Sequence, residues 1–186
     1  LKRRNSWNNK PMISGKPMQV HDPELPSWPD HQQLWQWSLS LYPRIKTIAL
    51  DWQDQFGVNV NLLLLLLYLQ RKQQQLSPAE IEQLQQAVAL QQQHFTSPLR
   101  LLRRQLPAHL SEQAAAAFKQ QLLEAELHSE KLEQQQLIQC LQGLQPRHPT
   151  AHLSLSILYL QLLQIDPTPL QPQIIDLDQA VAAVVF

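Results

Sequence analysis

The stretch that decides the fold is residues 34–70, which read LWQWSLSLYPRIKTIALDWQDQFGVNVNLLLLLLYLQ. It holds three of the five tryptophans of the chain and a run of six leucines. Residues 62–69 are apolar on every side of a helix, which indicates a helix buried at the centre of a domain. This segment is far shorter than the roughly twenty residues that cross a bilayer, so we expect a core helix and no membrane span.

Further helices are predicted on both sides of this central one. Residues 29–42 show helical apolar spacing and end at Pro43, which should stop the helix. A second helix is expected over residues 44–56, with Gly57 as its C-terminal cap. Asn59 or Asn61 then caps the leucine-rich helix.

The second half of the chain contains the clearest signals for where helices begin. Residues 77–80, Ser-Pro-Ala-Glu, form a capping box with proline in the first turn. The helix that follows should break or kink at Ser97-Pro98 and resume over residues 99–106. Ser111 caps a long helix that Gly143 closes. We expect its inward side chains to be apolar: Ala114, Phe118, Leu122, Ala125, Leu132 and Leu141.

A last helix is predicted over residues 149–165, and the alternation of Leu153, Leu155 and Ile157 at its start leaves a strand as a minor alternative. Together these segments predict an all-α fold, a single domain of about six helices around the buried leucine-rich helix. We expect this helical domain to span residues 28–165. Residues 1–27 are proline-containing and read as a disordered or extended arm. Residues 166–186 read as a proline-containing tail whose apolar end either docks on the domain or belongs to a partner surface.

Composition narrows the functional classes. Of the 186 residues only 16% are charged, and glutamine replaces the missing charge along most predicted helices. The formal net charge is zero, which argues against a nucleic-acid partner and leaves little repulsion between copies. A protein partner or self-association is therefore expected. The single cysteine, Cys140, fits a reducing compartment, so we expect a cytoplasmic location.

An acidic pair offers the first candidate site. Asp51 and Asp54 lie three residues apart on one helical face, with Gln53 between them. Paired carboxylates can bind a divalent ion or act as acid and base, as in helical prenyl-transfer enzymes. Those enzymes need a second acidic motif, for which Glu124 with Glu126, or Glu130 with Glu133, is a weak substitute. The simpler interpretation is a helix cap or an ion pair with arginine.

An arginine cluster offers the second candidate site. Arg100, Arg103 and Arg104 share one helical face, opposite Leu99, Leu102 and Leu106. Such a cluster could bind a carboxylate or phosphate in bidentate fashion. It could equally pair with Asp51 and Asp54 inside the fold or face solvent. The candidate ligand-binding residues are thus Asp51, Gln53, Asp54, Arg100, Arg103 and Arg104. No catalytic set, metal site or cofactor site is predicted.

The first block also carries a family resemblance. The patterns W-x-W-S-L-x-L-Y and L-D-W-Q-D-x-F-G-V-N-V-N-L-L-L resemble a family of uncharacterised proteobacterial proteins, domain of unknown function 2390. The likeness extends to the proline-leucine-arginine segment 98–104 and covers about residues 28–165. An acidic residue often stands in the family where this chain has Asn59. The resemblance implies a bacterial, cytosolic α-helical protein without implying a mechanism.

Two functions follow from these observations. The first is a non-enzymatic protein-interaction or accessory module, which suits the neutral glutamine-rich surface and the incomplete catalytic set. The alternative is a small-molecule or divalent-metal-binding helical enzyme that uses Asp51 and Asp54. The position of these aspartates relative to the arginine cluster discriminates between the two.

Overall fold

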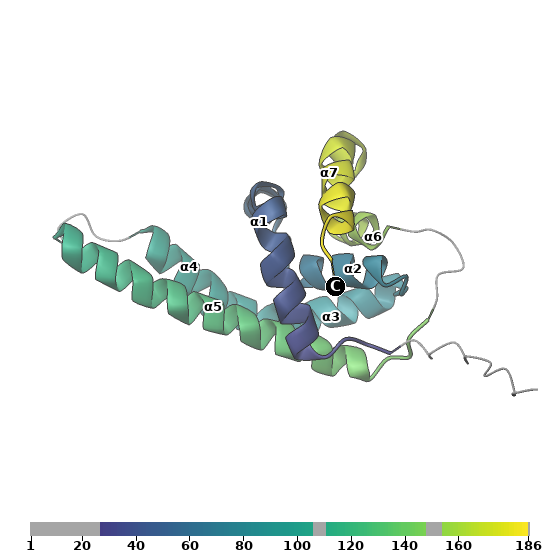
Figure 1. The fold of residues 1–186 in the computed structure, drawn as a ribbon, viewed down its shortest axis with the longest axis horizontal. Helices are drawn as coiled ribbons and strands as arrows, with labels where there is room; N and C mark the ends of the chain where they lie inside the picture. Colours follow the sequence, from purple (N-terminus) through teal and green to yellow (C-terminus); the bar gives the residue numbers. More distant parts are fainter. Residues whose placement is uncertain (1–26, 106–110, 148–153, 186) are drawn as a thin grey trace, which may run out of the picture.

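The all-α prediction is confirmed by a computed structural model, which describes residues 27–105, 111–147 and 154–185. No strand occurs in these ranges, and the helices form a single domain (Figure 1). Seven α-helices, one π-helical segment and one 3₁₀ turn are described, in the order α1 (His31–Phe56), α2 (Val60–Arg71), α3 (Pro78–Gln91), the π-helical segment Gln92–Thr96, α4 (Ser97–Arg104), α5 (Glu112–Gln142), α6 (Leu155–Leu162), the 3₁₀ turn Thr168–Leu170 and α7 (Gln171–Ala182).

Helix α2 is the buried centre, as its sequence predicts. Every residue from 61 to 69 is buried, and α1, α5, α6 and α7 all pack against this helix. The Asn59 side chain accepts a hydrogen bond from the Leu62 amide and so caps the helix. Within the described part of the chain, no helix has both the length and the apolar character to cross a membrane.

Helix α1 departs from the expectation that Pro43 ends a helix. The chain forms one continuous helix of 26 residues with Pro43 inside it. Its buried stripe runs in phase through the proline and consists of Leu34, Trp37, Ser38, Leu41, Ile45, Ala49 and Trp52. Pro43 itself is exposed, so the carbonyl that loses its amide partner lies on the solvent side. Burial of the stripe on both sides of the proline outweighs the local cost of about 3 kcal/mol.

The C-terminal segment also differs from the expectation. The sequence predicts a tail over residues 166–186 and leaves open whether its apolar end docks on the domain; these residues contain α7, which packs against α1 and α2. Ile174, Leu177 and Val181 are buried in the core, and the indole nitrogen of Trp52 donates to Gln173 Oε1. The prolines of this segment lie before the helix or in its first turn, where they are tolerated. Residues 1–26, which make up nearly all of the predicted N-terminal arm, lie outside the described residues.

Helices α3, α4 and α5 form the elongated part of the molecule. Figure 1 shows α4 lying along the end of α5 that is far from α6 and α7. The capping box at Ser77 and Glu80 is present, and Ser111 caps α5 as predicted. At Ser97-Pro98 the chain stays helical, because the preceding segment Gln92–Thr96 widens into a π-helix. We call α4 and the part of α5 beside it, residues 118–134, the arm. This name is distinct from the predicted N-terminal arm of residues 1–27.

Candidate functional site

The inward face of α5 is polar over much of its length. We expected apolar residues there, but Ala114, Phe118, Ala125 and Leu132 are exposed or only partly covered, and only Leu122 and Leu141 are buried. The buried positions between residues 122 and 137 are polar or charged: Glu126, Ser129, Glu133 and Gln134. The predicted helical periodicity is correct, but the face of α5 that turns inward is a different one from the face predicted. A polar face can turn inward because side chains of α4 and α2 supply hydrogen-bond and ion-pair partners to it.

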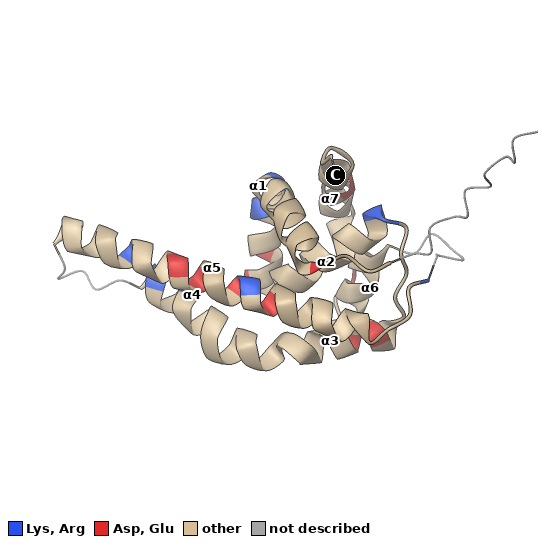
Figure 2. Ribbon diagram, turned by 60° about the horizontal axis from the view of Figure 1, so that its bottom comes forward, with Lys and Arg blue, Asp and Glu red and all other residues tan. Residues whose placement is uncertain are grey.

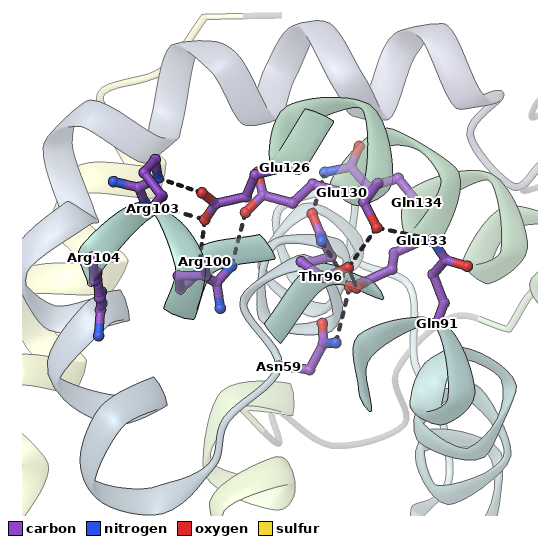
Figure 3. Close-up of polar contacts among 12 residues, drawn as sticks. Asn59, Gln91, Thr96, Arg100, Arg103, Arg104, Glu126, Glu130, Glu133 and Gln134 are labelled. Carbon is purple, nitrogen blue, oxygen red and sulfur yellow. Dashed lines mark hydrogen bonds and ion pairs between the residues drawn. The ribbon is translucent and has the colours of Figure 1, made fainter. Parts of the chain in front are cut away.

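Two arginines of α4 point toward α5 and bind its carboxylates (Figure 3). The Nε atoms of Arg100 and Arg103 lie 2.8 Å and 2.5 Å from the two oxygens of Glu126. The Nη2 atom of Arg100 lies 2.9 Å from Glu130 Oε1. The Glu126 side chain is only 5% exposed, so this carboxylate is nearly excluded from water, while its arginine partners are partly buried. Figure 2 shows basic residues on α4 and acidic residues on the neighbouring part of α5, in a ribbon that is mostly uncharged.

The two carboxylates respond in opposite ways to this environment. Burial opposes ionisation of Glu126, but hydrogen bonds from Arg103 and Arg100 outweigh it and lower the Glu126 pKa. Burial raises the pKa of Glu130 to about 6, although the Arg100 charge acts against this rise. Burial, followed by the charge of Glu130, also raises the pKa of Tyr42. The cluster therefore contains one carboxylate that stays ionised and one that titrates in mildly acidic solution.

A second buried group, Glu133, is held by neutral donors. Its Oε2 atom accepts hydrogen bonds from the amides of Asn59, at 3.1 Å, and Asn61, at 2.9 Å. Its Oε1 atom accepts from the hydroxyl of Thr96. Glu133 is 1% exposed, so these three donors replace its hydration. The network ties the start of α2 to α5 and to the π-helical segment.

The π-helical segment explains how Thr96 reaches this network. The Ser97 amide donates to the Gln92 carbonyl five residues back, and the wider turn carries Thr96 to a buried position facing α5. There its hydroxyl also lies 2.8 Å from that of Ser129. The side chain of Gln91, one residue before the segment, donates to the same Ser129. The local widening therefore serves a buried polar contact.

A cleft of about 400 Å³ opens beside the arginine–glutamate cluster. It lies between α1, α4 and α5, and its lining includes Tyr42, Lys46, Leu50, Gln53, Val60, Arg100, Arg103, Arg104, Leu123, Glu126, Leu127 and Glu130. A narrower recess of about 70 Å³ adjoins it, because Tyr42, Val60, Leu127 and Glu130 line both. The recess is mainly apolar and continues to Trp35, Leu39 and Leu64.

The structure places the six candidate ligand-binding residues unequally. Gln53, Arg100, Arg103 and Arg104 all line the cleft, whereas Asp51 and Asp54 do not. Asp54 contacts Arg104 at 3.3 Å in a pair whose side chains are 52% and 44% exposed. Asp51 is exposed on α1.

The sequence suggests Asp54 as a partner for the arginine cluster, and Asp54 does pair with Arg104, but it does not indicate which residues pair with Arg100 and Arg103. Glu126 and Glu130 appeared in the sequence only as a possible second acidic motif. A usable signal was present, since Arg100 and Arg103 are three apart on one helix and Glu126 and Glu130 four apart on the next. Two complementary faces on neighbouring helices predict pairing across a hairpin. Among the described residues, no group of three or more His, Cys, Asp or Glu could hold a metal ion.

Comparison with known families supports the resemblance in the first block. Residues 33–137 match the model of a family described as protein of unknown function (DUF2390). The match includes the leucine-rich helix, the arginine cluster and the carboxylates Glu126, Glu130 and Glu133. No curated protein and no solved structure matches the chain significantly.

Proposed function

The chain belongs to the DUF2390 family, and from the geometry of its arm we propose that it is a non-enzymatic module that binds another protein. The observation that carries the proposal is the reversed polarity of α4. We assign the docking surface to the exposed side chains of Leu101 and Leu102 in α4 and of Phe95 just before it, and we call these three residues the outer face of the arm.

Helix α4 has no buried residue, although it is strongly amphipathic. In a surface helix of a globular protein the apolar side normally faces the core and the charged side faces water. Here Arg100 and Arg103 turn inward to Glu126, while Leu101 and Leu102 remain 53% and 56% exposed. Phe95, just before α4, is 57% exposed. Bulky apolar side chains that gather on an exposed helix favour a protein interface.

The chemistry of the outer face favours an apolar groove of a partner protein. A short helix that presents leucines and phenylalanine fits the helix-in-groove mode of recognition. The ion pairs behind α4 hold its backbone in place, so little conformational freedom is lost on binding. In this proposal the protein acts in the cytoplasm, which suits its single cysteine.

Site-specific photo-cross-linking in the cells that make the protein tests the proposal. A photoreactive residue at Leu102 should give a discrete adduct with one partner, and the same residue at Lys119, exposed on α5, should not. Adding Leu101→Asn should weaken the adduct. Because both leucines are exposed, the Leu101→Asn/Leu102→Asn variant should change the free energy of unfolding by no more than about 0.5 kcal/mol.

The cross-linking result distinguishes binding to a different protein from self-association and from the absence of a docking surface. An adduct of two chains of this protein would support self-association through the same face in place of a different partner. Equal labelling at Leu102 and Lys119, or an adduct insensitive to Leu101→Asn, would overturn the proposal. The alternative, a divalent-metal enzyme built on Asp51 and Asp54, has weaker support, because Asp51 lies outside the cleft and Asp54 engages Arg104.

A further inference from the structure

We propose that the cleft between α1, α4 and α5 binds a small organic monocarboxylate whose short apolar substituent enters the adjoining recess. This site is separate from the outer face of the arm, because the arginines and the leucines lie on opposite sides of α4. Three features of the cleft carry the inference: hydrogen-bond donors that remain available, a small excess of positive charge, and an apolar extension.

Two of the donors are arginines that ion pairs already hold in place, and the third is the amide of Gln53. Arg100 and Arg103 use their Nε and Nη2 atoms on Glu126 and Glu130. Among the described residues neither Nη1 group takes part in these contacts, and both side chains line the cleft. The Gln53 amide nitrogen is buried and has no hydrogen-bond partner in the described part of the chain. A buried donor without a partner is costly, and a ligand oxygen in the cleft would satisfy it.

The charge balance selects a single negative charge. The cleft is lined by four cationic side chains, Lys46, Arg100, Arg103 and Arg104, and by two carboxylates, Glu126 and Glu130. Asp54, in contact with Arg104, adds a third carboxylate at the edge. With all seven groups charged, the site has an excess of one positive charge. A monocarboxylate neutralises this excess, whereas a phosphate dianion would leave the cleft with a net negative charge.

The recess determines which apolar substituent the bound carboxylate can have. Its apolar lining, Trp35, Leu39, Leu64 and Leu127, lies next to the cleft, since both cavities share Tyr42, Val60 and Leu127. A volume of about 70 Å³ suits a chain of a few carbons rather than a long acyl chain. Each methylene group removed from water there adds favourable free energy, so affinity should depend on both the charge and the substituent.

Isothermal titration calorimetry at pH 7.5 and low salt tests this with three probes. Hexanoate has both features, acetate has only the charge, and hexanamide has the chain without the charge. Hexanoate should bind at least roughly tenfold more tightly than either of the other two. Equal binding of hexanoate and hexanamide, or of hexanoate and acetate, would overturn the proposal, as would absence of hexanoate binding.

Matched variants locate the site without disturbing the fold. Arg104→Gln removes a half-exposed cation and should weaken hexanoate by roughly tenfold, while Lys119→Gln, on an exposed part of α5, should leave it unchanged. Leu39→Ala should weaken hexanoate but not acetate, because Leu39 is half exposed and lines only the recess. Equal affinities of Arg104→Gln and Lys119→Gln would place binding elsewhere. The Leu101→Asn/Leu102→Asn variant should bind hexanoate normally, so this test fails or succeeds independently of the interaction proposal.

Discussion

The body around α2 and the arm formed by α4 and α5 have opposite polarity. In the body, the inward side chains are those of the leucine run 62–67, and the buried polar groups lie mainly at or near helix ends. In the arm, the inward side chains are Glu126, Arg100 and Arg103, and Leu101 and Leu102 of α4 are exposed to solvent. The chain therefore contains two kinds of interior. Burial of apolar side chains holds the body together, and ion pairs hold the arm.

The two interiors contribute different things: the leucine core of the body contributes stability, and the ion pairs of the arm fix an orientation. Burial of leucine stabilises the body without regard to direction. Buried ion pairs contribute less net stability, because desolvation offsets the attraction, but they require particular distances and angles. The arm is thus held in one arrangement by directional contacts. Its apolar side chains are left available, which is the basis of the interaction proposal.

The largest effect is expected in the body. Leu65→Ala removes a side chain that is fully buried on α2 and leaves a cavity, so we expect a loss of about 4 kcal/mol in the free energy of unfolding. Urea unfolding followed by circular dichroism measures it. Because α2 contacts helices on several sides, protection from hydrogen exchange should fall in α1, α5 and α7 together. A loss confined to α2 would contradict a shared core.

A smaller and more local effect is expected in the arm. Glu126→Gln replaces the carboxylate that binds Arg100 and Arg103, and the new amide NH₂ group faces donors, so we expect a loss of about 3 kcal/mol. Hydrogen exchange should accelerate first in α4. Glu124→Gln, on the exposed side of the same helix, is the matched control and should change little. If α2 exchanged as fast as α4 in Glu126→Gln, the two regions would not be energetically distinct.

The smallest effect is a pH dependence that originates in the arm. The Glu130 pKa is raised from 4.5 to about 6, so the folded state binds this proton more tightly than the unfolded state. Stability from this group is therefore full below pH 4.5 and is lost as the pH rises through 6, by about 2 kcal/mol. The charged and titratable groups facing it are Arg100 and Arg103 of α4, Glu126 and Glu133 of α5, and Tyr42 and Lys46 of α1.

Comparison with Glu130→Gln isolates this contribution. The glutamine still accepts a hydrogen bond from Arg100 but does not titrate, so the wild-type protein should lose about 2 kcal/mol more than the variant between pH 4.5 and 7.5. Glu126 acts in the opposite direction, since its pKa is lowered, but it is present in both proteins and cancels. Urea unfolding at the two pH values measures the difference. Parallel pH profiles would show that Glu130 is not the group that titrates.

Much of the helical framework could be predicted from the sequence, because its signals act over a few residues. The Ser77 capping box, the Ser111 cap, Gly57 and the cap at Asn59 are each formed within one turn, so neighbouring residues suffice to predict them. Pro43 was misleading for the same reason. Its local preference is to end a helix, but the stripe from Leu34 to Trp52 is buried against distant segments that the local pattern does not contain.

The sequence by itself determined the all-α class, the buried leucine-rich helix, the helix caps and the family. Only the tertiary structure decided which partner each charge has. Arg100 could have paired with Asp54, and the contacts with Glu126 and Glu130 follow from the antiparallel packing of α4 on α5. The rotated polar face of α5 and the outward leucines of α4 follow from the same packing. The physical reason is that caps and periodicity depend on neighbours in the chain, whereas the environment of a charge depends on residues that folding brings near it.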